Sequence, residues 1–330
     1  MRNGLPLIDL HRHLDGNLRL GTVLDLAREH GLSLPAWEPE ELRPHVQVMS
    51  REPDLLGFLA KFALLKRVLV DYDAVRRIAR ENLEDAVAEG IDYIELRFSP
   101  YFMAEEHKLD PFGVVEACCD ALEEARDLPV LARLIVIISR HYGPEVGEIE
   151  LETALAHRHR GVVALDLAGD EANFPGELFV RHFARARDGG LRLVAHAGEA
   201  SGASSVGQAV LELGAERIGH GVRAVEDPAV LELLAERRIA LECCPTSNLQ
   251  TSTVPDLSRH PLPFFLQSGQ LVTLNTDDPS ISGIDLAHEY RVAREELGLS
   301  EEELAQLQRN ALEAAFLTPE ERRRLLASPG

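Results

Sequence analysis

Cysteine is scarce in this chain of 330 residues, and its scarcity excludes two kinds of protein. The four cysteines stand as two adjacent pairs, Cys118-Cys119 and Cys243-Cys244, without the spaced framework of a disulfide-rich secreted domain. A Cys-x-x-Cys zinc spacing is also absent. We therefore expect four buried, reduced thiols, and we expect histidine and carboxylate side chains to hold any metal.

Basic residues are few as well, with 34 Lys and Arg against 55 Asp and Glu, so the formal net charge is −21. Such a surface repels phosphodiester backbones and anionic lipid headgroups, which argues against nucleic acid and membranes as partners. The chain lacks an apolar run long enough to span a membrane, and its first residues do not have the pattern of a signal peptide. We expect a cytoplasmic protein.

What the sequence does contain is an alternation of short apolar runs with helical stretches. The runs expected to form strands cover residues 7–13, 93–99, 131–138, 162–168, 191–196, 217–219, 240–243 and 271–276. Eight strands that alternate with helices are the number that a closed (β/α)8 barrel, the TIM barrel, requires. No repeat or flexible linker interrupts the pattern, so we predict a single α/β barrel domain over residues 1–330.

Several helix ends carry clear signals. Asp73 is expected to cap a helix that buries Val75, Ile78, Leu83 and Val87 and stops at Gly90. The other expected starts are Asp227 before Pro228, and the capping boxes of Ser300 with Glu303 and of Thr318 with Glu321. The last two signals predict that the chain closes with helices packed on the barrel.

The connection between the first two strands, from Leu14 to Asp92, is far longer than a barrel needs, so it should carry extra helices over the barrel mouth. One expected helix there is apolar around its circumference, with Leu55, Leu56, Phe58, Leu59, Phe62 and Leu65. By itself this pattern is typical of a helix buried against its neighbours. The functional interpretation is a lid that covers a flat aromatic ligand and excludes water.

Polar side chains gather where the expected strands end. His11 and His13 alternate on the first strand, so both imidazoles share a face. The further groups are His196 and Glu199 after the fifth strand, His220 between two glycines after the sixth, and Asp277 and Asp278 after the eighth. Each could instead be a hydrogen-bonded core histidine, a helix cap or a turn residue. Their common place at the carboxyl ends of strands, where barrel enzymes have their sites, favours an active site.

Five motifs in this order resemble the adenosine deaminase family. They are His-x-His-Leu-Asp-Gly at 11–16, Asp-Leu-Ala-Gly-Asp-Glu at 166–171, His-Ala-Gly-Glu at 196–199, Ile-Gly-His-Gly at 218–221 and Thr-Asp-Asp-Pro at 276–279. Residues 93–100 and 244–248 are also similar to family segments, so the resemblance runs nearly end to end. As a set, the motifs are highly specific.

The resemblance implies one Zn²⁺ per chain. Its implied ligands are His11, His13, His196 and Asp277. His220 and Asp278 resemble the pair that orients and deprotonates the attacking water, and Glu199 resembles the acid that protonates N1 of the purine.

The resemblance also implies contacts with the substrate. Asp15 resembles the carboxylate that accepts a ribose hydroxyl, the Gly169 backbone would meet N3, and Phe58 and Phe62 resemble lid aromatics. His13 and Asp278 are expected to face the substrate as well. No role is assigned to Ser139, Arg140 and His141, and for Asp9 a hydrogen bond to a metal ligand is conceivable.

The implied reaction is hydrolytic deamination of adenosine and 2′-deoxyadenosine to inosine and deoxyinosine with release of ammonia, in purine salvage. Aminodeoxyfutalosine and free adenine stay open as alternative substrates, although relatives that deaminate the free base tend to carry Glu where Asp15 stands.

Three other classes of protein fit the sequence less well. Cytidine-type deaminases need His-x-Glu with Pro-Cys-x-x-Cys, which is absent. Two-metal barrel hydrolases often use a carboxylated lysine at a strand end, and no expected strand ends in lysine. In a binding protein that has lost its chemistry, some catalytic positions would be empty, but here all are filled.

Overall fold

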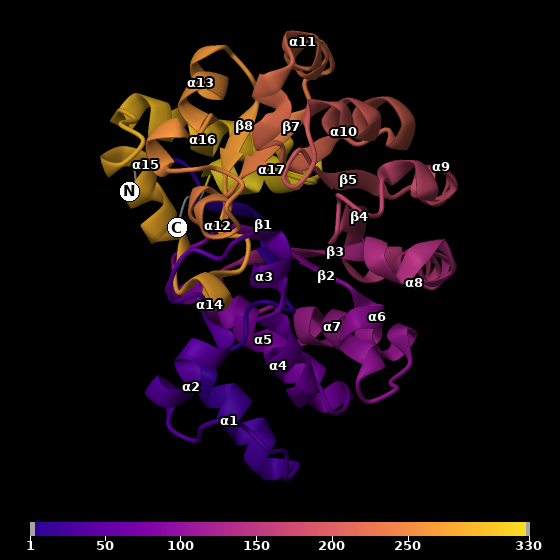
Figure 1. Ribbon diagram of the computed structural model, residues 1–330. Coiled ribbons are helices and arrows are strands. Elements are labelled where there is room, and N and C mark those ends of the chain that lie inside the picture. Colours follow the sequence, from indigo (N-terminus) through magenta and orange to yellow (C-terminus); the bar gives the residue numbers. More distant parts are fainter. Residues whose placement is uncertain (1–3, 328–330) are drawn as a thin grey trace.

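The computed structural model describes residues 4–327, and its centre is a ring of parallel strands with helices around it (Figure 1). The strands follow one another in chain order: β1 (Ile8–His13), β2 (Tyr93–Phe98), β3 (Leu131–Ser139), β4 (Val162–Ala168), β5 (Arg192–Ala197), β6 (Arg217–His220), β7 (Ala240–Cys243) and β8 (Val272–Leu274). Every predicted strand is confirmed within two residues at each end. The fold is therefore the predicted (β/α)8 barrel.

The barrel closes between β1 and the segment that follows β8. The Asp277 amide donates to the His11 carbonyl at 2.7 Å, and the His13 amide donates to the Asp277 carbonyl at 2.8 Å. The same backbone bonds that close the barrel thus place Asp277 beside both histidines of β1.

The longer helices form the outer layer around the barrel (Figure 1), and several shorter helices lie between them in the chain. Those of the first half are α1 (Leu20–Glu29), α2 (Pro39–Val46), α3 (Leu55–Leu59), α4 (Phe62–Leu65), α5 (Tyr72–Ala88), α6 (Pro100–Glu105), α7 (Pro111–Glu124) and α8 (Gly143–His157). Those of the second half are α9 (Val180–Asp188), α10 (Ala203–Gln208), α11 (Pro228–Arg237), α12 (Pro245–Gln250), α13 (Leu262–Gln267), α14 (Pro279–Ser282), α15 (Leu286–Glu295), α16 (Glu301–Ala314) and α17 (Pro319–Ala327). No helix within residues 4–327 is long and apolar enough to cross a membrane.

The predicted cap of α5 was wrong by two residues. Asp71, which has an extended backbone, accepts a hydrogen bond from the Ala74 amide at 2.8 Å and begins the helix. Asp73 lies within the first turn and pairs with Arg76 instead. The other predicted end signals are confirmed: the Asp227 cap, the two capping boxes, and Gly90 with a positive φ after the helix.

The long connection between β1 and β2 carries the expected extra helices, but its apolar segment is two short helices rather than one. Asp54 caps α3. The Lys61 amide then donates to the Phe58 carbonyl, three residues back, which interrupts the α-helical pattern, and α4 begins at Phe62. The segment is not buried all round, because Leu56 is 52% exposed. The four cysteines are buried and free, as predicted.

Candidate active site

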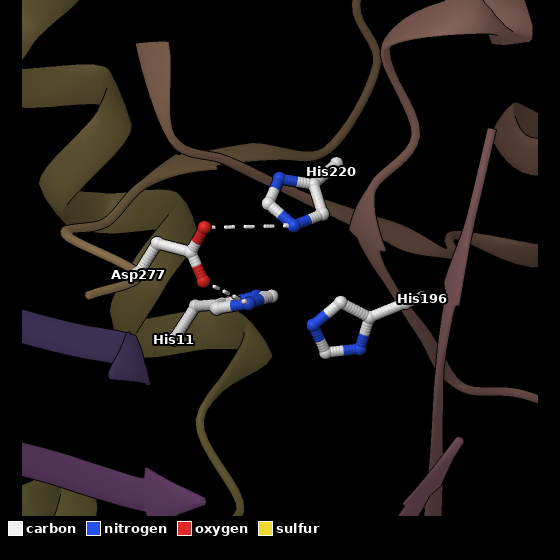
Figure 2. A group of neighbouring side chains, drawn as sticks. All are labelled: His11, His196, His220 and Asp277. Atoms are coloured by element: carbon white, nitrogen blue, oxygen red, sulfur yellow. Dashed lines mark ion pairs between the residues drawn. The ribbon is translucent and has the colours of Figure 1, made fainter. Parts of the chain in front are cut away.

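The carboxyl ends of the strands bring the predicted polar residues together. His11, His196, His220 and Asp277 each offer one ligand atom, and these atoms all lie within 4.8 Å of one another. Figure 2 shows the four side chains pointing toward one another across a common space. His13 forms a second such group with Asp277 and Asp278. Segments far apart in the sequence therefore supply one cluster.

The distances within the cluster suit donor atoms that face a shared ligand. His11 Nε2 lies 3.1 Å and His13 Nε2 lies 3.3 Å from the same oxygen, Asp277 Oδ1. The Nε2 atoms of His13 and His196 are 3.3 Å apart. Each implied zinc ligand thus has a donor atom close to that of another, although the group of four within 4.8 Å contains His220 in place of His13.

Two buried carboxylates determine which ring nitrogens carry hydrogen. Glu242 lies 2.8 Å from His11 Nδ1, and Asp166 lies 3.2 Å from His196 Nδ1. A proton on each Nδ1 leaves the Nε2 lone pair free to bind a metal. Burial lowers the pKa of His196 to about 3, so its imidazole is neutral. His11 Nε2 is buried and makes no hydrogen bond among the described residues, although it faces Asp277 Oδ1, as two donor atoms of one metal ion would. Neutral imidazoles and a carboxylate are donors that fit a zinc ion.

Neither Asp166 nor Glu242 was among the residues predicted for the site. A buried guanidinium joins them, because Arg97 donates to Asp166 and to Glu242, each at 2.8 Å. The signal in the sequence was an acidic residue in the middle of an apolar strand, which parallel strands buried on both faces otherwise avoid.

Two residues of this site have a strained backbone. His220 has φ of 60° and Asp277 has φ of 65°, in the left-handed region that non-glycine residues seldom adopt. Such a conformation costs about 1–3 kcal/mol and persists only where the surroundings impose it. Both residues carry their strain at a strand end that faces the cluster.

Two glycines leave the space that the cluster occupies. A Cβ at Gly219 would lie 2.9 Å from His11 Cε1 and 3.1 Å from His196 Cγ. A Cβ at Gly16 would lie 1.7 Å from Asp278 Oδ1. The glycines of two motifs are therefore explained by close contact with site residues rather than by a turn.

A chain of hydrogen bonds determines the tautomer of His220. The Leu262 amide donates to His260 Nδ1 at 3.1 Å, so the ring proton of neutral His260 is on Nε2, 3.1 Å from Asn248 Oδ1. The Asn248 amide nitrogen then donates to His220 Nδ1 at 3.0 Å. Burial lowers the pKa of His220, and the neutral ring carries its proton on Nε2, which faces the site.

Glu199 is the acidic group next to this imidazole, with Oε2 at 3.6 Å from His220 Nε2. Burial raises the pKa of the Glu199 carboxyl to about 8, and the charges of Asp277 and Glu171 act in the same direction. A carboxyl in this state holds a proton at neutral pH and can donate it.

A cavity of about 440 Å³ lies over the cluster. The predicted residues that line it are His13, Asp15, Phe58, Phe62, Gly169, His196, Glu199, His220, Asp277 and Asp278. Asp15 Oδ2 accepts from the Ser99 amide at 3.2 Å, whereas Asp15 Oδ1 has no hydrogen-bond partner among residues 4–327. His11 is fully buried and is not among the lining residues.

The residues left without a role fall into two groups. Ser139 and His141 line the cavity, whereas Arg140 is buried and donates to the His196 carbonyl at 2.6 Å. Asp9 accepts from Thr276 Oγ1 at 2.6 Å and from the His11 amide at 3.2 Å. Asp9 therefore supports the backbone of a candidate ligand and the closure of the barrel.

The family model described as adenosine deaminase matches residues 6–328. Adenosine deaminase of Serratia proteamaculans is 55% identical over 322 residues, 97% of each chain. Adenosine deaminase of Klebsiella pneumoniae is 55% identical over 325 residues, 98% of this chain and 97% of the relative.

Two similar crystal structures are an adenine deaminase from Arthrobacter aurescens and an amidohydrolase with bound Zn from Burkholderia ambifaria. The first has a TM-score of 0.90 and 30% identity, covering 98% of this chain and 97% of that one. The second has a TM-score of 0.88 and 27% identity, with coverages of 98% and 89%. With the barrel and its histidine and aspartate cluster in place, the full-length match shows that this chain belongs to the adenosine deaminase family.

Proposed function

We propose that this enzyme uses one zinc ion to deaminate adenosine and 2′-deoxyadenosine, releasing ammonia and inosine or deoxyinosine, in purine salvage. The observation that carries the proposal is the cluster of His11, His13, His196 and Asp277 beside a cavity that also holds Glu199. We further propose that the barrel and its helices act as one domain in the cytoplasm.

His11, His13, His196 and Asp277 would hold the zinc ion, with Glu242 and Asp166 orienting two of the imidazoles. When bound, zinc makes a coordinated water acidic, with a pKa that falls toward about 7.

His220 and Asp278 act on the attacking water. The Nε2 hydrogen of His220 donates to the water oxygen and orients it, because Asn248 occupies the other ring nitrogen. Asp278 Oδ1 is buried with no hydrogen-bond partner in the described chain. Burial, together with the charge of Asp277, raises the pKa of Asp278, so its ionised carboxylate is a stronger base toward the water's proton. The oxygen then adds to C6 of the purine.

Glu199 acts as the general acid, whereas Asp278 acts as the base. Its carboxyl, protonated at neutral pH, donates to N1 of the purine, so that C6 becomes electrophilic as the water adds. The proton that Asp278 took from the water then passes to the amino group, and the C6–N bond breaks with release of ammonia. The C6 hydroxyl loses its proton, which restores the Glu199 carboxyl, and C6=O forms while N1 keeps its hydrogen. General acid–base help of this kind contributes about a hundred- to ten-thousand-fold.

The cavity favours a nucleoside over a nucleotide. Asp15 Oδ1 makes no hydrogen bond among the described residues, and it lies 3.8 Å from His13 Nδ1. It would accept a ribose hydroxyl and repel a phosphate dianion at the same place. Among the described residues that line the cavity, none is lysine or arginine. Phe58 and Phe62 of α3 and α4 would cover the purine as a lid, and the Gly169 backbone would meet N3.

The test is a comparison of kcat/KM for adenosine, 2′-deoxyadenosine, adenine, adenylate and aminodeoxyfutalosine with the zinc-loaded enzyme. We expect the two nucleosides to be converted best, with adenine at least about a hundredfold lower, because the sugar contacts are lost. Adenine is the competing candidate, since the similar Arthrobacter aurescens structure is of an adenine deaminase. A higher kcat/KM for adenine, adenylate or aminodeoxyfutalosine than for adenosine would refute the assignment.

A further inference from the structure

A second buried glutamate, Glu171, lies behind Glu199 on the loop that follows β4, and it is not among the residues that line the cavity. Its carboxylate accepts five hydrogen bonds, all from the segment that leads from β5 into α10. The donors are the amides of Gly198 (2.7 Å), Glu199 (3.1 Å), Ala200 (2.7 Å) and Ser201 (2.8 Å), and the hydroxyl of Ser205 (2.6 Å).

Four consecutive amides can meet one carboxylate only if the backbone curls around it. Residues 198–201, the Glu199 loop, have no strand or helix partners for these amides. Gly198 begins the curl with φ of 68°, where a Cβ would also lie 2.5 Å from Val206 Cγ2. Hydrogen bonds to an ionised acceptor are about twice as strong as neutral ones, so Glu171 determines the shape of the loop.

The loop in turn places the proposed acid. The Glu199 amide is itself one of the bound donors, so the backbone from which the Glu199 side chain extends is held directly by Glu171. A displacement of about 1 Å in a reacting group can cost about a hundredfold in rate. Glu171 is only 3% exposed, so solvent cannot replace its five bonds without opening the loop.

We propose that Glu171 is a positioning residue for the deamination. Its hydrogen bonds fix the Glu199 loop and thereby orient the Glu199 carboxyl toward the purine. This inference rests on the role of Glu199 in the proposed function. Glu171 accepts hydrogen bonds only from residues that follow His196 and from no implied zinc ligand, so its effect on catalysis passes through Glu199.

The main test is Glu171→Gln in the full-length, zinc-loaded enzyme. Glutamine keeps one acceptor oxygen but turns an amide NH₂ toward backbone N–H donors, so the loop should shift. We expect kcat for adenosine to fall about ten- to a hundredfold, with KM changed less than about threefold and zinc content unchanged. Glu171→Asp, which keeps the charge on a shorter side chain, should recover part of the loss. Glu177→Gln, at an exposed position of the same connection, is the matched control.

A purely structural role would give a different pattern. In a Glu199→Gln background, Glu171→Gln should cause almost no further loss of kcat, because the group that it aims is already disabled. Hydrogen exchange of the four loop amides should speed up in Glu171→Gln and not in Glu177→Gln. Wild-type kcat in Glu171→Gln, or an equal loss in both backgrounds, overturns the proposal.

The two proposals fail separately. If the wild-type enzyme does not deaminate adenosine, the proposed function is wrong. If the wild type is active and Glu171→Gln matches it in kcat and loop exchange, only the positioning role is wrong. Should Glu171→Gln fail to fold, Glu171→Asp still tests the inference, because an unaltered kcat and unaltered loop exchange in that variant would contradict it.

Discussion

At the scale of single residues, the buried carboxyl groups of the site have different roles. Of its buried carboxylates, Asp277 lies among the imidazole donors, whereas Asp166 and Glu242 bond to the outer nitrogens of two imidazoles. Glu199 instead has a pKa raised by burial to about 8. Position and partners, not residue type, therefore separate metal ligand, orienting group and acid.

Glu199→Gln tests the role of the acid. The amide cannot donate a proton to N1 as a carboxylic acid does, so kcat should fall at least about a hundredfold while KM changes little. Steady-state kinetics with adenosine measure both constants, and metal analysis should still find one zinc per chain. His196→Ala is the contrasting variant, which should lose zinc and activity together. Turnover near the wild-type level in Glu199→Gln would remove Glu199 from this role.

At the scale of elements, α8 is tied to the barrel mouth by a buried carboxyl. Glu150 accepts from Ser99 Oγ at 2.5 Å and from the Ser139 amide at 3.0 Å, so it joins the ends of β2 and β3. Burial raises the pKa of Glu150 to about 8. Because the folded protein prefers the protonated form, this group links the stability of the barrel mouth to pH.

The sign of this linkage gives a prediction. The contribution of Glu150 to stability is fully present below its ordinary pKa of 4.5, and it is lost as pH rises through about 8. Glu150→Gln does not titrate, so its free energy of unfolding should improve relative to wild type between pH 5 and about pH 8.5. Each unit of pKa shift corresponds to about 1.4 kcal/mol. Urea unfolding of both proteins at several pH values measures the difference, and a constant difference across this range would contradict the linkage.

At the scale of the whole molecule, the proposed zinc ligands come from β1, β5 and the segment after β8. Among these ligands, His13 and His196 are 183 residues apart in the sequence, and His13 and Asp277 are 264 residues apart. A metal that binds only the folded chain stabilises it by mass action, by about 4 kcal/mol at a thousandfold excess over Kd. Zinc should therefore support the barrel as well as the chemistry.

Removal of the metal tests this effect. A strong chelator should abolish activity and lower Tm by about 5 °C or more, and added zinc should restore both. Calorimetry or circular dichroism follows Tm, and elemental analysis should count one zinc per chain. His196→Ala is the control, since its Tm should respond little to the chelator. No divalent ion, or two per chain in an active preparation, would contradict the site.

Sequence alone predicted the eight strands and the barrel, because alternation and apolar runs are local patterns, and its short motifs indicated most of the predicted residues that line the cavity. Sequence missed the cap at Asp71 and the break between α3 and α4, where tertiary contacts and local bonding compete. Only the tertiary structure decided that Glu242 orients His11, 231 residues away, and that Glu171 grips the Glu199 loop. Each of these carboxylates lies in a different sequence motif or segment from the group that it bonds to. A buried carboxylate requires hydrogen-bond partners, and here only the closed barrel brings those partners near.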